Sequence, residues 1–374
     1  MRPAGPLRDR PRRGGMFGLA ERTLVSQGEM NERARLLESR GLSVPGGEGV
    51  VIGLYSGERL VATGSLIGDI LQGIAVEKSF EGEGAAAAVT TALIKKGVEL
   101  GRRRLFLYSS PEEARRFEAL GFSLLATAVA RSSGLGAALL EWGPDNADKW
   151  KESALAASEG KPGEAGIVVV NCNPFTLGHY SLLERAAARA KWLYALVVQE
   201  DRSLFPFDVR LRLVREGVSG LSNVTVLPGG PYVISAATFP TYFTRIEAEE
   251  DVRLVELYAS LDVELFGRLI APAFRASDRF VGTEPYCPVT SVYNRVMKER
   301  LPLGGEDWPP VAVHELPRLE MRGEAVSASR VREYIRGGDM EAAFRLVPGT
   351  TRAWIESTEA GPVIEKIRSG TSRH

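Results

Sequence analysis

One stretch of the chain, Asn171–His179, has residue types and spacing suited to holding a phosphate group. It follows the apolar run Ile167–Val170, which predicts a strand, and it precedes an Ala- and Leu-rich run that predicts a helix over about 180–190. A strand, a tight turn and a helix start is where an α/β protein binds a nucleotide phosphate. Thr176 and His179 lie three residues apart across this helix start, so we expect both to donate hydrogen bonds to one phosphate. The stretch therefore predicts chemistry at the α-phosphate of a nucleoside triphosphate.

The same stretch supplies further candidate contacts to a nucleotide. Gly178 has no Cβ, which lets the backbone approach a ligand closely. Asn171 and Asn173 can orient the turn or contact phosphate, although an Asn before Pro is also a common turn residue. We interpret Cys172 as a small buried apolar residue and not as a nucleophile. Besides the catalytic Thr176 and His179, the nucleotide contacts predicted here are Asn171, Asn173, Pro174, Phe175 and Gly178.

A second stretch, Val326–Arg332, also has the residue types of a phosphate site and opens a predicted helix. Ser327 and Ser329 place two hydroxyl groups at the helix N-terminus, where backbone N–H groups are free. Arg332 adds a fixed positive charge one turn later, which suits the β- and γ-phosphates. We predict that Ser329 and Arg332 are catalytic. Ser327 and Val331 are predicted to contact the nucleotide.

Two further segments carry candidate residues. The nucleotide contacts are predicted to include three residues that follow a strand, Gly282, Thr283 and Glu284, with an ordinary strand-to-helix turn as the alternative. We expect Asp208 to cap the helix that begins there. Arg210, two residues later, is interpreted as part of a solvated helix face, with a phosphate contact as the alternative.

Length and composition bound the possible functions. The chain has 374 residues, which favours two domains, and its 44% hydrophobic and 25% charged residues are typical of a soluble globular enzyme. A formal net charge of +0 gives no drive for binding nucleic acid, and no apolar run is long enough to span a membrane. The two cysteines favour a reducing, cytoplasmic compartment. Scattered histidines and cysteines lack zinc-site spacing, so we expect no protein-bound metal and only Mg2+ that accompanies the nucleotide.

The segment from Val50 to Phe122 shows strands, then a helix, a strand and a helix. Strands are predicted at Val50–Tyr55, Arg59–Ser65, Leu71–Val76 and Leu105–Ser109, and helices at Ala87–Leu100 and Pro111–Leu120. This order resembles the Gcn5-related N-acetyltransferase (GNAT) fold, in which a Gly-rich turn holds the coenzyme A pyrophosphate. Glu81 stands where that turn has Gln or Arg. A negative charge beside a pyrophosphate is unfavourable, so we interpret this unit as a structural or docking domain. An active acetyltransferase is the alternative.

From Ile167 onward, predicted strands alternate with helices, which argues for a parallel sheet with helices on both faces. Strands are predicted at Ile167–Asn171, Leu193–Gln199, Val224–Leu227, Phe280–Gly282 and Val311–Leu316, and helices at Asp208–Val218, Asp251–Leu269 and Val289–Arg300. The fold class expected is α/β, with a GNAT-like α+β domain followed by a Rossmann-like nucleotidyltransferase domain.

The domain boundaries follow from these patterns. We expect a disordered tail at 1–15, a GNAT-like domain at 16–145 and a catalytic domain at 167–346. Residues 146–166 are polar and small and are predicted to form a linker. Residues 347–374 are left as a C-terminal extension.

The two phosphate stretches together resemble the HxGH nucleotidyltransferase superfamily, with Thr176 in place of its first His. Within it, the chain resembles the citrate lyase ligase family over about 16–346. The resemblance rests on Asn171–His179, Glu200–Phe207, Ser235–Phe243, Arg279–Pro285 and Ser327–Arg332. It implies that ATP and acetate give acetyl-adenylate and pyrophosphate. The acetyl group would then pass to the prosthetic-group thiol on the acyl carrier subunit of citrate lyase, which is the implied partner.

The residues suit the first step, because donors that neutralise charge on the phosphoryl oxygens favour attack at the α-phosphorus. No general base is needed, since acetate is ionised at pH 7. Two alternatives stay open. One is an adenylyltransferase for a phosphate monoester such as phosphopantetheine, which the apolar Ser235–Phe243 segment disfavours. The other is a non-catalytic regulator that binds nucleotide or acyl-CoA.

Overall fold

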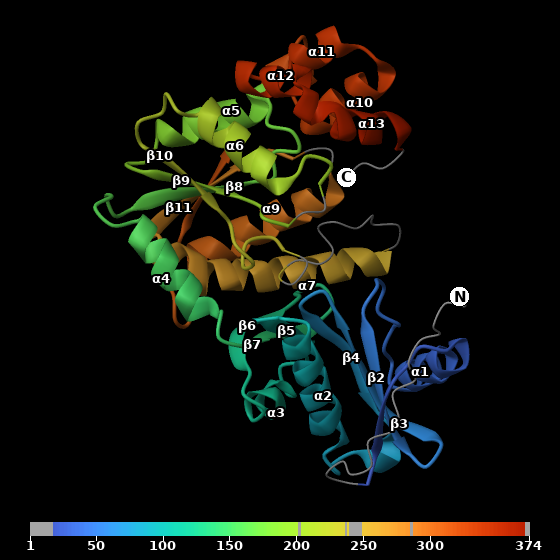
Figure 1. The fold of residues 1–374 in the computed structure, drawn as a ribbon. Helices are drawn as coiled ribbons and strands as arrows, with labels where there is room; N and C mark the ends of the chain where they lie inside the picture. Colours follow the sequence, from blue (N-terminus) through green and yellow to red (C-terminus); the bar gives the residue numbers. More distant parts are fainter. Residues whose placement is uncertain (1–17, 201–202, 236–237, 239–248, 285–286, 371–374) are drawn as a thin grey trace. The chain divides into compact units, whose positions relative to one another are not determined.

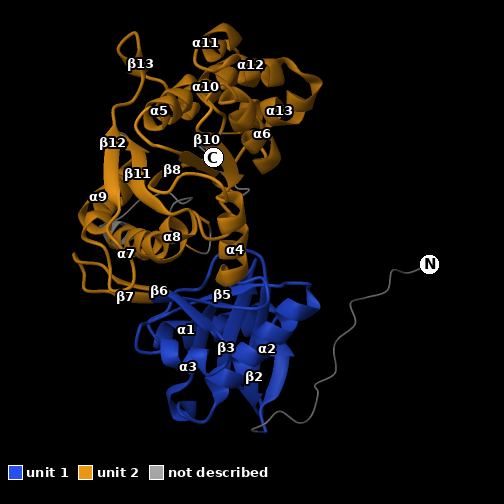
Figure 2. Cartoon of the chain, turned by 90° about the vertical axis from the view of Figure 1, so that its left-hand side faces the viewer, with its two compact units in different colours: residues 1–125, 138–146 blue, residues 126–137, 147–374 orange. Residues whose placement is uncertain are grey.

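The computed structural model describes residues 18–200, 203–235, 238, 249–284 and 287–370. The chain divides into two compact units (Figure 2), residues 1–125 with 138–146, and residues 126–137 with 147–374. The expected tail at 1–15 lies outside the described residues. None of the described helices is long and apolar enough to cross a membrane.

The N-terminal unit is built on a seven-stranded mixed sheet in the order β1-β2-β3-β4-β5-β7-β6. Only the β4–β5 pair is parallel among the strand pairs whose register is known. The strands are β1 (Ala20–Thr23), β2 (Val50–Ser56), β3 (Arg59–Ile67), β4 (Ile70–Val76), β5 (Leu105–Ser109), β6 (Ser123–Val129) and β7 (Gly136–Trp142). The helices are α1 (Gln27–Ser39), α2 (Ala85–Glu99) and α3 (Ala114–Glu118). The strands and helices expected between Val50 and Phe122 are thus confirmed, with shifted ends.

The second unit is built on a five-stranded, wholly parallel sheet in the order β10-β9-β8-β11-β12. The strands are β8 (Ala165–Val170), β9 (Leu193–Val197), β10 (Val224–Pro228), β11 (Ala276–Gly282) and β12 (Ala312–Leu316). A small hairpin, β13 (Glu320–Met321) with β14 (Glu324–Ala325), follows. The chain order runs from β8 in one direction to β10 and in the other to β12. The crevice between β8 and β11 is therefore the topological switch point, where ligands bind in such sheets.

Helices cover both faces of this sheet (Figure 1). The helices of this unit are α4 (Ala147–Ala157), α5 (Leu177–Ala187), α6 (Phe207–Gly217), α7 (Glu249–Leu265) continued by a π-helical turn (Phe266–Ile270), α8 (Ala271–Ala273), α9 (Pro288–Arg300), α10 (Ala328–Gly337), α11 (Met340–Phe344), α12 (Gly349–Glu356) and α13 (Gly361–Ser369). Alternate residues of each strand point to opposite faces. Val168 and Val170 join one apolar core with α5, α6 and α10, whereas Ile167 joins the other with α7 and α9. The α/β class and the parallel sheet are as expected from the apolar strand runs.

Three local features differ from the sequence-based expectation. The 146–166 segment contains the helix α4, whose Trp150 packs edge-on against Tyr232 (ring centroids 5.6 Å apart) and Phe274 (6.1 Å). Asp208 does not cap α6: the N-cap is Pro206, without a side-chain hydrogen bond, and Asp208 lies in the first turn. In the C-terminal extension, buried apolar side chains of α12 and α13 belong to the same core as β8 and α5.

Candidate active site

The side chain of Arg210, in α6, fixes the turn after β8. It is fully buried and donates hydrogen bonds to the ends of β8 and β9 and to the loop after them. Nη1 donates to Asn171 O (2.9 Å), Asn171 Oδ1 (2.9 Å) and Val198 O (2.7 Å). Nε donates to Phe205 O (3.0 Å) and Nη2 to Glu200 O (3.0 Å). Both interpretations made from the sequence, a solvated face and a phosphate contact, are therefore wrong.

The amide side chains of Asn171 and Asn173 orient the same turn. Asn171 Nδ2 donates to Ser203 Oγ at 3.1 Å, while Asn173 Oδ1 accepts the backbone N–H of Phe205 at 3.0 Å. Asn173 is 4% exposed and is followed by a cis peptide bond to Pro174. These contacts favour the orienting role over a phosphate contact for both residues.

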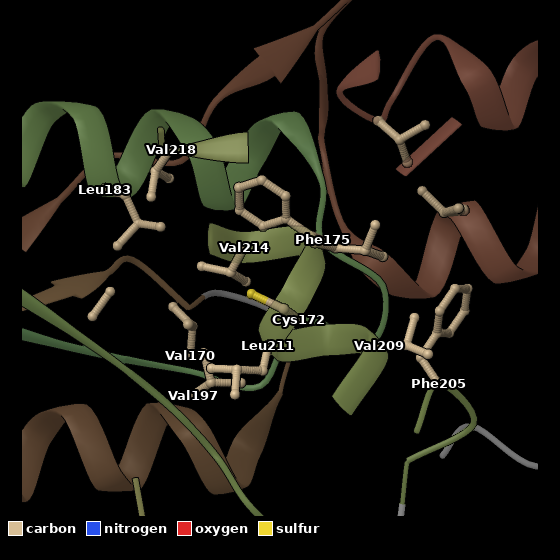
Figure 3. Packing of buried hydrophobic residues seen from close by; sticks show 14 of the residues in the cluster. Val170, Cys172, Phe175, Leu183, Val197, Phe205, Val209, Leu211, Val214 and Val218 are labelled. Carbon is tan, nitrogen blue, oxygen red and sulfur yellow. The ribbon is translucent and has the colours of Figure 1, made fainter. Parts of the chain in front are cut away.

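Phe175 and Cys172 place their side chains in the core beneath the turn (Figure 3). Phe175 is fully buried, and its ring lies so close to Gly217 that a Cβ there would approach it to 2.4 Å. Thr351 Oγ1 donates to Phe175 O at 2.9 Å. Burial raises the pKa of the Cys172 thiol, in agreement with its interpretation as an apolar residue. The Phe175 ring is a core side chain, so the predicted contact of Phe175 with the nucleotide would have to come from its backbone.

Thr176 and His179 form a capping box at the start of α5. Thr176 Oγ1 accepts the backbone N–H of His179 at 3.3 Å, and His179 Nδ1 accepts the backbone N–H of Thr176 at 3.1 Å. The Thr176 hydroxyl is fully buried and lies 2.9 Å from His179 Nδ1. Thr176 therefore orients the imidazole, and the expectation that it donates to phosphate beside His179 is corrected.

The capping box fixes the tautomer of His179. Because Nδ1 accepts a backbone N–H, the proton of the neutral ring must be on Nε2. Burial and the positive charges of Arg318 and Arg332 lower the pKa of His179 to about 4. The ring is thus neutral at pH 7. Nε2–H has no hydrogen-bond partner among the described residues, so it is a donor available to a ligand.

The two phosphate stretches meet at Gly178. A Cβ at Gly178 would lie 2.5 Å from the carbonyl oxygen of Val326, the residue before the N-cap of α10. Arg332 adds a second link, because its Nη1 donates to the carbonyl of Asn173. The glycine was expected to admit a ligand. Its observed close approach is to the other stretch, and the helix starts of α5 and α10 are joined as a result.

The N-terminus of α10 presents several donors. Ser327 is the N-cap, and its Oγ accepts the N–H of Arg330 at 3.3 Å. The first-turn N–H groups of Ala328 and Ser329 have no partner within the described ranges. Arg332 is 5% exposed and donates through Nη2 to Ser329 Oγ at 3.3 Å. A helix start with a nearby guanidinium is a suitable place for an anion.

Val331, which was assigned to the nucleotide, is fully buried in the core beneath α10. Its position follows from the period of the helix, since Val331 and Ile335 lie four residues apart on the same face of α10 and both belong to the core. The side chain therefore positions the helix and does not contact a ligand.

The residues after β11 hold an arginine that the sequence analysis missed, Arg318. Thr283 accepts from it twice, at O from Nε (2.6 Å) and at Oγ1 from the backbone N–H (3.2 Å). Glu284 pairs with its Nη2 and also accepts the N–H of Cys287 at 3.1 Å. Gly282 O accepts from Asn294 Nδ2 at 2.9 Å. The available signal was position: Arg318 lies two residues after a predicted strand, at the carboxyl edge of the sheet.

No cluster of three or more His, Cys, Asp or Glu side chains suited to a metal occurs among the residues that the structure describes. Near the candidate site, the Glu284 carboxylate is already engaged by Arg318 and by the N–H of Cys287. The donor set fits a polyanion, whose own oxygens would carry any Mg2+.

Curated relatives align over most of the chain. The citrate (pro-3S)-lyase ligase of Klebsiella pneumoniae is 40% identical over 80% of this chain and 84% of that protein. The ligase of that name from Escherichia coli K12 is 35% identical over 91% of this chain and 95% of that protein. The ligase from Haemophilus influenzae is 34% identical over 82% of this chain and 88% of that protein.

Among solved structures, the ribosomal-protein-S18-alanine N-acetyltransferase of Escherichia coli has a TM-score of 0.30 at 15% identity and covers 33% of this chain and 93% of that chain. FeeM, an N-acyl amino acid synthase from uncultured soil microbes, has a TM-score of 0.30 at 18% identity and covers 38% of this chain and 95% of that chain.

The family model for the citrate lyase ligase C-terminal domain matches residues 165–355, which span β8 to α12 and contain both phosphate stretches. With this match and the curated relatives, the chain belongs to the citrate lyase ligase family.

Proposed function

We propose that this protein is an ATP-dependent ligase that activates acetate as acetyl-adenylate. An acetate oxygen attacks the α-phosphorus of ATP, the bond to the bridging oxygen breaks, and pyrophosphate leaves with the electron pair. A thiolate then attacks the acyl carbon and AMP leaves. The acceptor thiol is that of the prosthetic group on the acyl carrier subunit of citrate lyase, the protein that the relatives' names specify.

The observation that carries this proposal is the junction of the two helix starts. The contacts of Gly178 with Val326 O and of Arg332 with Asn173 O join the start of α5, which carries His179, to the start of α10. A triphosphate can then lie with its α-phosphate at His179 and its β- and γ-phosphates at Ser327 and Ser329. Donors fixed before the reaction stabilise charge that develops on the phosphoryl oxygens.

The charge state of the site suits this step. His179 is neutral at pH 7 because its pKa is lowered to about 4, and it donates without needing to gain or lose a proton. The fixed charge comes from Arg332 and Arg318. Acetate arrives ionised, so the attacking group needs no base. Mg2+ bound to the phosphates would offset the remaining negative charge.

We further propose that catalysis resides in the second unit and that the first unit serves in docking or structure. The glycine turn before α2 carries Glu81, which pairs with Arg40, and α2 begins without a side-chain cap. An acidic side chain at a helix start is suited to stabilising the helix and disfavours a pyrophosphate there. The free thiols of Cys172 and Cys287 accord with a cytoplasmic location, which also remains part of the proposal.

The test is pyrophosphate release by the purified protein with ATP, Mg2+ and acetate, with and without deacetylated citrate lyase. We expect release that depends on acetate, rises with the lyase and is accompanied by acetylation of the lyase thiol. Release that requires a phosphate monoester, such as phosphopantetheine, would instead identify another adenylyltransferase. The apolar Ser235–Phe243 segment, invoked against that alternative, lies mostly outside the described residues. Nucleotide binding without release with any acceptor would identify a regulator.

A further inference from the structure

Arg318 lies at the edge of the sheet where a ligand is expected. Arg318 lies two residues after the end of β12. Strand β12 pairs with β11, which in turn pairs with β8. The switch point of the sheet is between β8 and β11, so the loops after these two strands flank the crevice. Thr283 N donates to Leu316 O at 3.0 Å, which extends the β11–β12 pairing to the start of the Arg318 loop.

The Arg318 side chain is held on one side only. Nε donates to Thr283 O at 2.6 Å, and Nη2 pairs with Glu284. Glu284 is itself fixed, because its Oε1 accepts the N–H of Cys287 at the N-cap of α9 (3.1 Å). Two anchored nitrogens fix the plane of a guanidinium. Nη1 has no partner among the residues described, and the side chain is 28% exposed.

The loop that carries Arg318 is bonded to α5 and to the start of α10. Val326 N, before α10, donates to Leu319 O at 2.9 Å, and Arg185 Nη1 of α5 donates to Pro317 O at 2.8 Å. The positive charges of Arg318 and Arg332 both contribute to lowering the pKa of His179. Two cations from different elements therefore act on the imidazole.

We propose that Arg318 is a further catalytic residue, which binds the phosphoryl group that is transferred, and that Glu284 is its positioning residue. Nη1 of Arg318 and Nε2 of His179 would donate to the non-bridging oxygens of the α-phosphate, while the start of α10 holds the leaving pyrophosphate. A guanidinium presents parallel N–H groups that match two phosphoryl oxygens. This assignment rests on the proposed function for the identity of the attacking acid.

The test compares Arg318→Gln and Arg318→Lys with Arg322→Gln, a matched control because Arg322 is an exposed arginine of the same connection between β12 and α10. The first readout is acetate-dependent exchange of pyrophosphate into ATP. We expect kcat to fall about 100-fold in Arg318→Gln, the size found for a lost oxyanion donor, and less in Arg318→Lys. The affinity for MgATP should change less than kcat. Arg322→Gln should match the wild type.

The second readout is independent of acetate: the ³¹P resonance of the α-phosphate of bound MgATP. It should shift in Arg318→Gln and not in Arg322→Gln. If the wild type shows no acetate-dependent exchange but this shift persists, the acid assigned under the proposed function is wrong and Arg318 still binds the α-phosphate. If resonance and exchange are both unchanged in folded Arg318→Gln, the assignment of Arg318 is overturned.

Glu284 is tested by Glu284→Gln and Glu284→Asp. Glu284→Gln removes the charge that anchors Nη2, so kcat should fall about 10-fold, less than in Arg318→Gln. Glu284→Asp should recover part of this loss because the carboxylate is retained. Adding Arg318→Gln to Glu284→Gln should cause no further loss beyond Arg318→Gln alone. A Glu284→Gln loss that adds fully to that of Arg318→Gln would contradict the positioning role.

Discussion

Each unit contains a strand followed by a glycine-bearing turn and a helix, and the two turns are built differently. In the first unit, the turn between β4 and α2 is held by backbone hydrogen bonds within 77–83 and by the ion pair of Arg40 with Glu81. A Cβ at Gly82 would meet nothing within 4 Å. The helix α2 begins at Gly84 without a side-chain cap. Apart from this exposed ion pair, the turn is held by backbone contacts close in the sequence.

In the second unit, the turn Asn171–His179 is held from outside. Arg210 of α6, Arg332 of α10 and Thr351 of α12 each donate to one of its carbonyl oxygens. Its glycine, Gly178, lies against a backbone carbonyl of the other stretch. The comparison teaches that a glycine turn at a helix start is common to both units. Buried side chains that donate to the carbonyl oxygens of the turn distinguish the candidate site.

The largest expected effect contrasts the two arginines that hold these turns. Arg210→Met should lower the free energy of unfolding by at least about 3 kcal/mol, because several buried carbonyl oxygens lose their donor. Arg40→Met removes an exposed ion pair and should cost about 0–1 kcal/mol. Denaturant unfolding of both variants measures the difference. Equal losses would contradict the contrast between the turns.

The next effect contrasts the glycines. In Gly178→Ala, the Cβ would lie 2.5 Å from Val326 O, so the two helix starts must separate and adenylation should fall at least about 100-fold. Gly82→Ala has open space, and its positive φ of 81° should cost only about 1 kcal/mol of stability with normal adenylation. Pyrophosphate exchange and thermal unfolding of both variants provide the comparison. Normal exchange in Gly178→Ala would show that the junction is dispensable.

His179→Ala tests the donor itself. The variant should lose about 3 kcal/mol of transition-state stabilisation, as for a lost oxyanion donor, and should keep the fold because His179 is not part of the apolar core. His179→Gln retains an N–H donor and should lose less. Turnover equal to the wild type in His179→Ala would remove His179 from the mechanism.

The smallest expected effect is that of Glu81→Gln. The side chain is about half exposed and paired with Arg40, and the first unit is proposed to have no part in adenylation. We expect pyrophosphate exchange within about twofold of the wild type, with a stability change of about 0–1 kcal/mol. A large loss of exchange would show that the first unit is coupled to the chemistry.

Much of the fold could be predicted from the sequence because strand periodicity and burial are local signals. The apolar runs around Ile167 and Leu193 became neighbouring parallel strands at the expected places. The start of α6 was misplaced because Asp208 has the residue type of an N-cap. The helix begins earlier, with Pro206 as the N-cap and Asp208 in the first turn. The helix α4 was missed, because its buried face consists of two alanines, Ala147 and Ala154, and Trp150, which form no strong apolar period.

The site was predicted only in part, because roles set by distant contacts leave no local pattern. Phe175 and Val331 stand inside phosphate motifs, yet helix and turn geometry direct both side chains into the core. Arg210 resembles a surface residue in an amphipathic helix, and only the fold shows the carbonyl groups that it binds. Arg318 has no motif around it at all. Its place beside the crevice depends on the pairing of β11 with β12.

The most direct test of the account is ¹⁵N NMR of histidine-labelled protein, because the chain has only three histidines. The account predicts that His179, assigned by its loss in His179→Gln, is neutral with the proton on Nε2 at every pH from about 5.5 to 8. The pKa is lowered to about 4, so protonation and loss of the capping box occur only below that range. Addition of MgATP should shift the Nε2 resonance. An Nδ1-protonated or positively charged ring at pH 7, or an Nε2 resonance that ignores MgATP, would contradict the account.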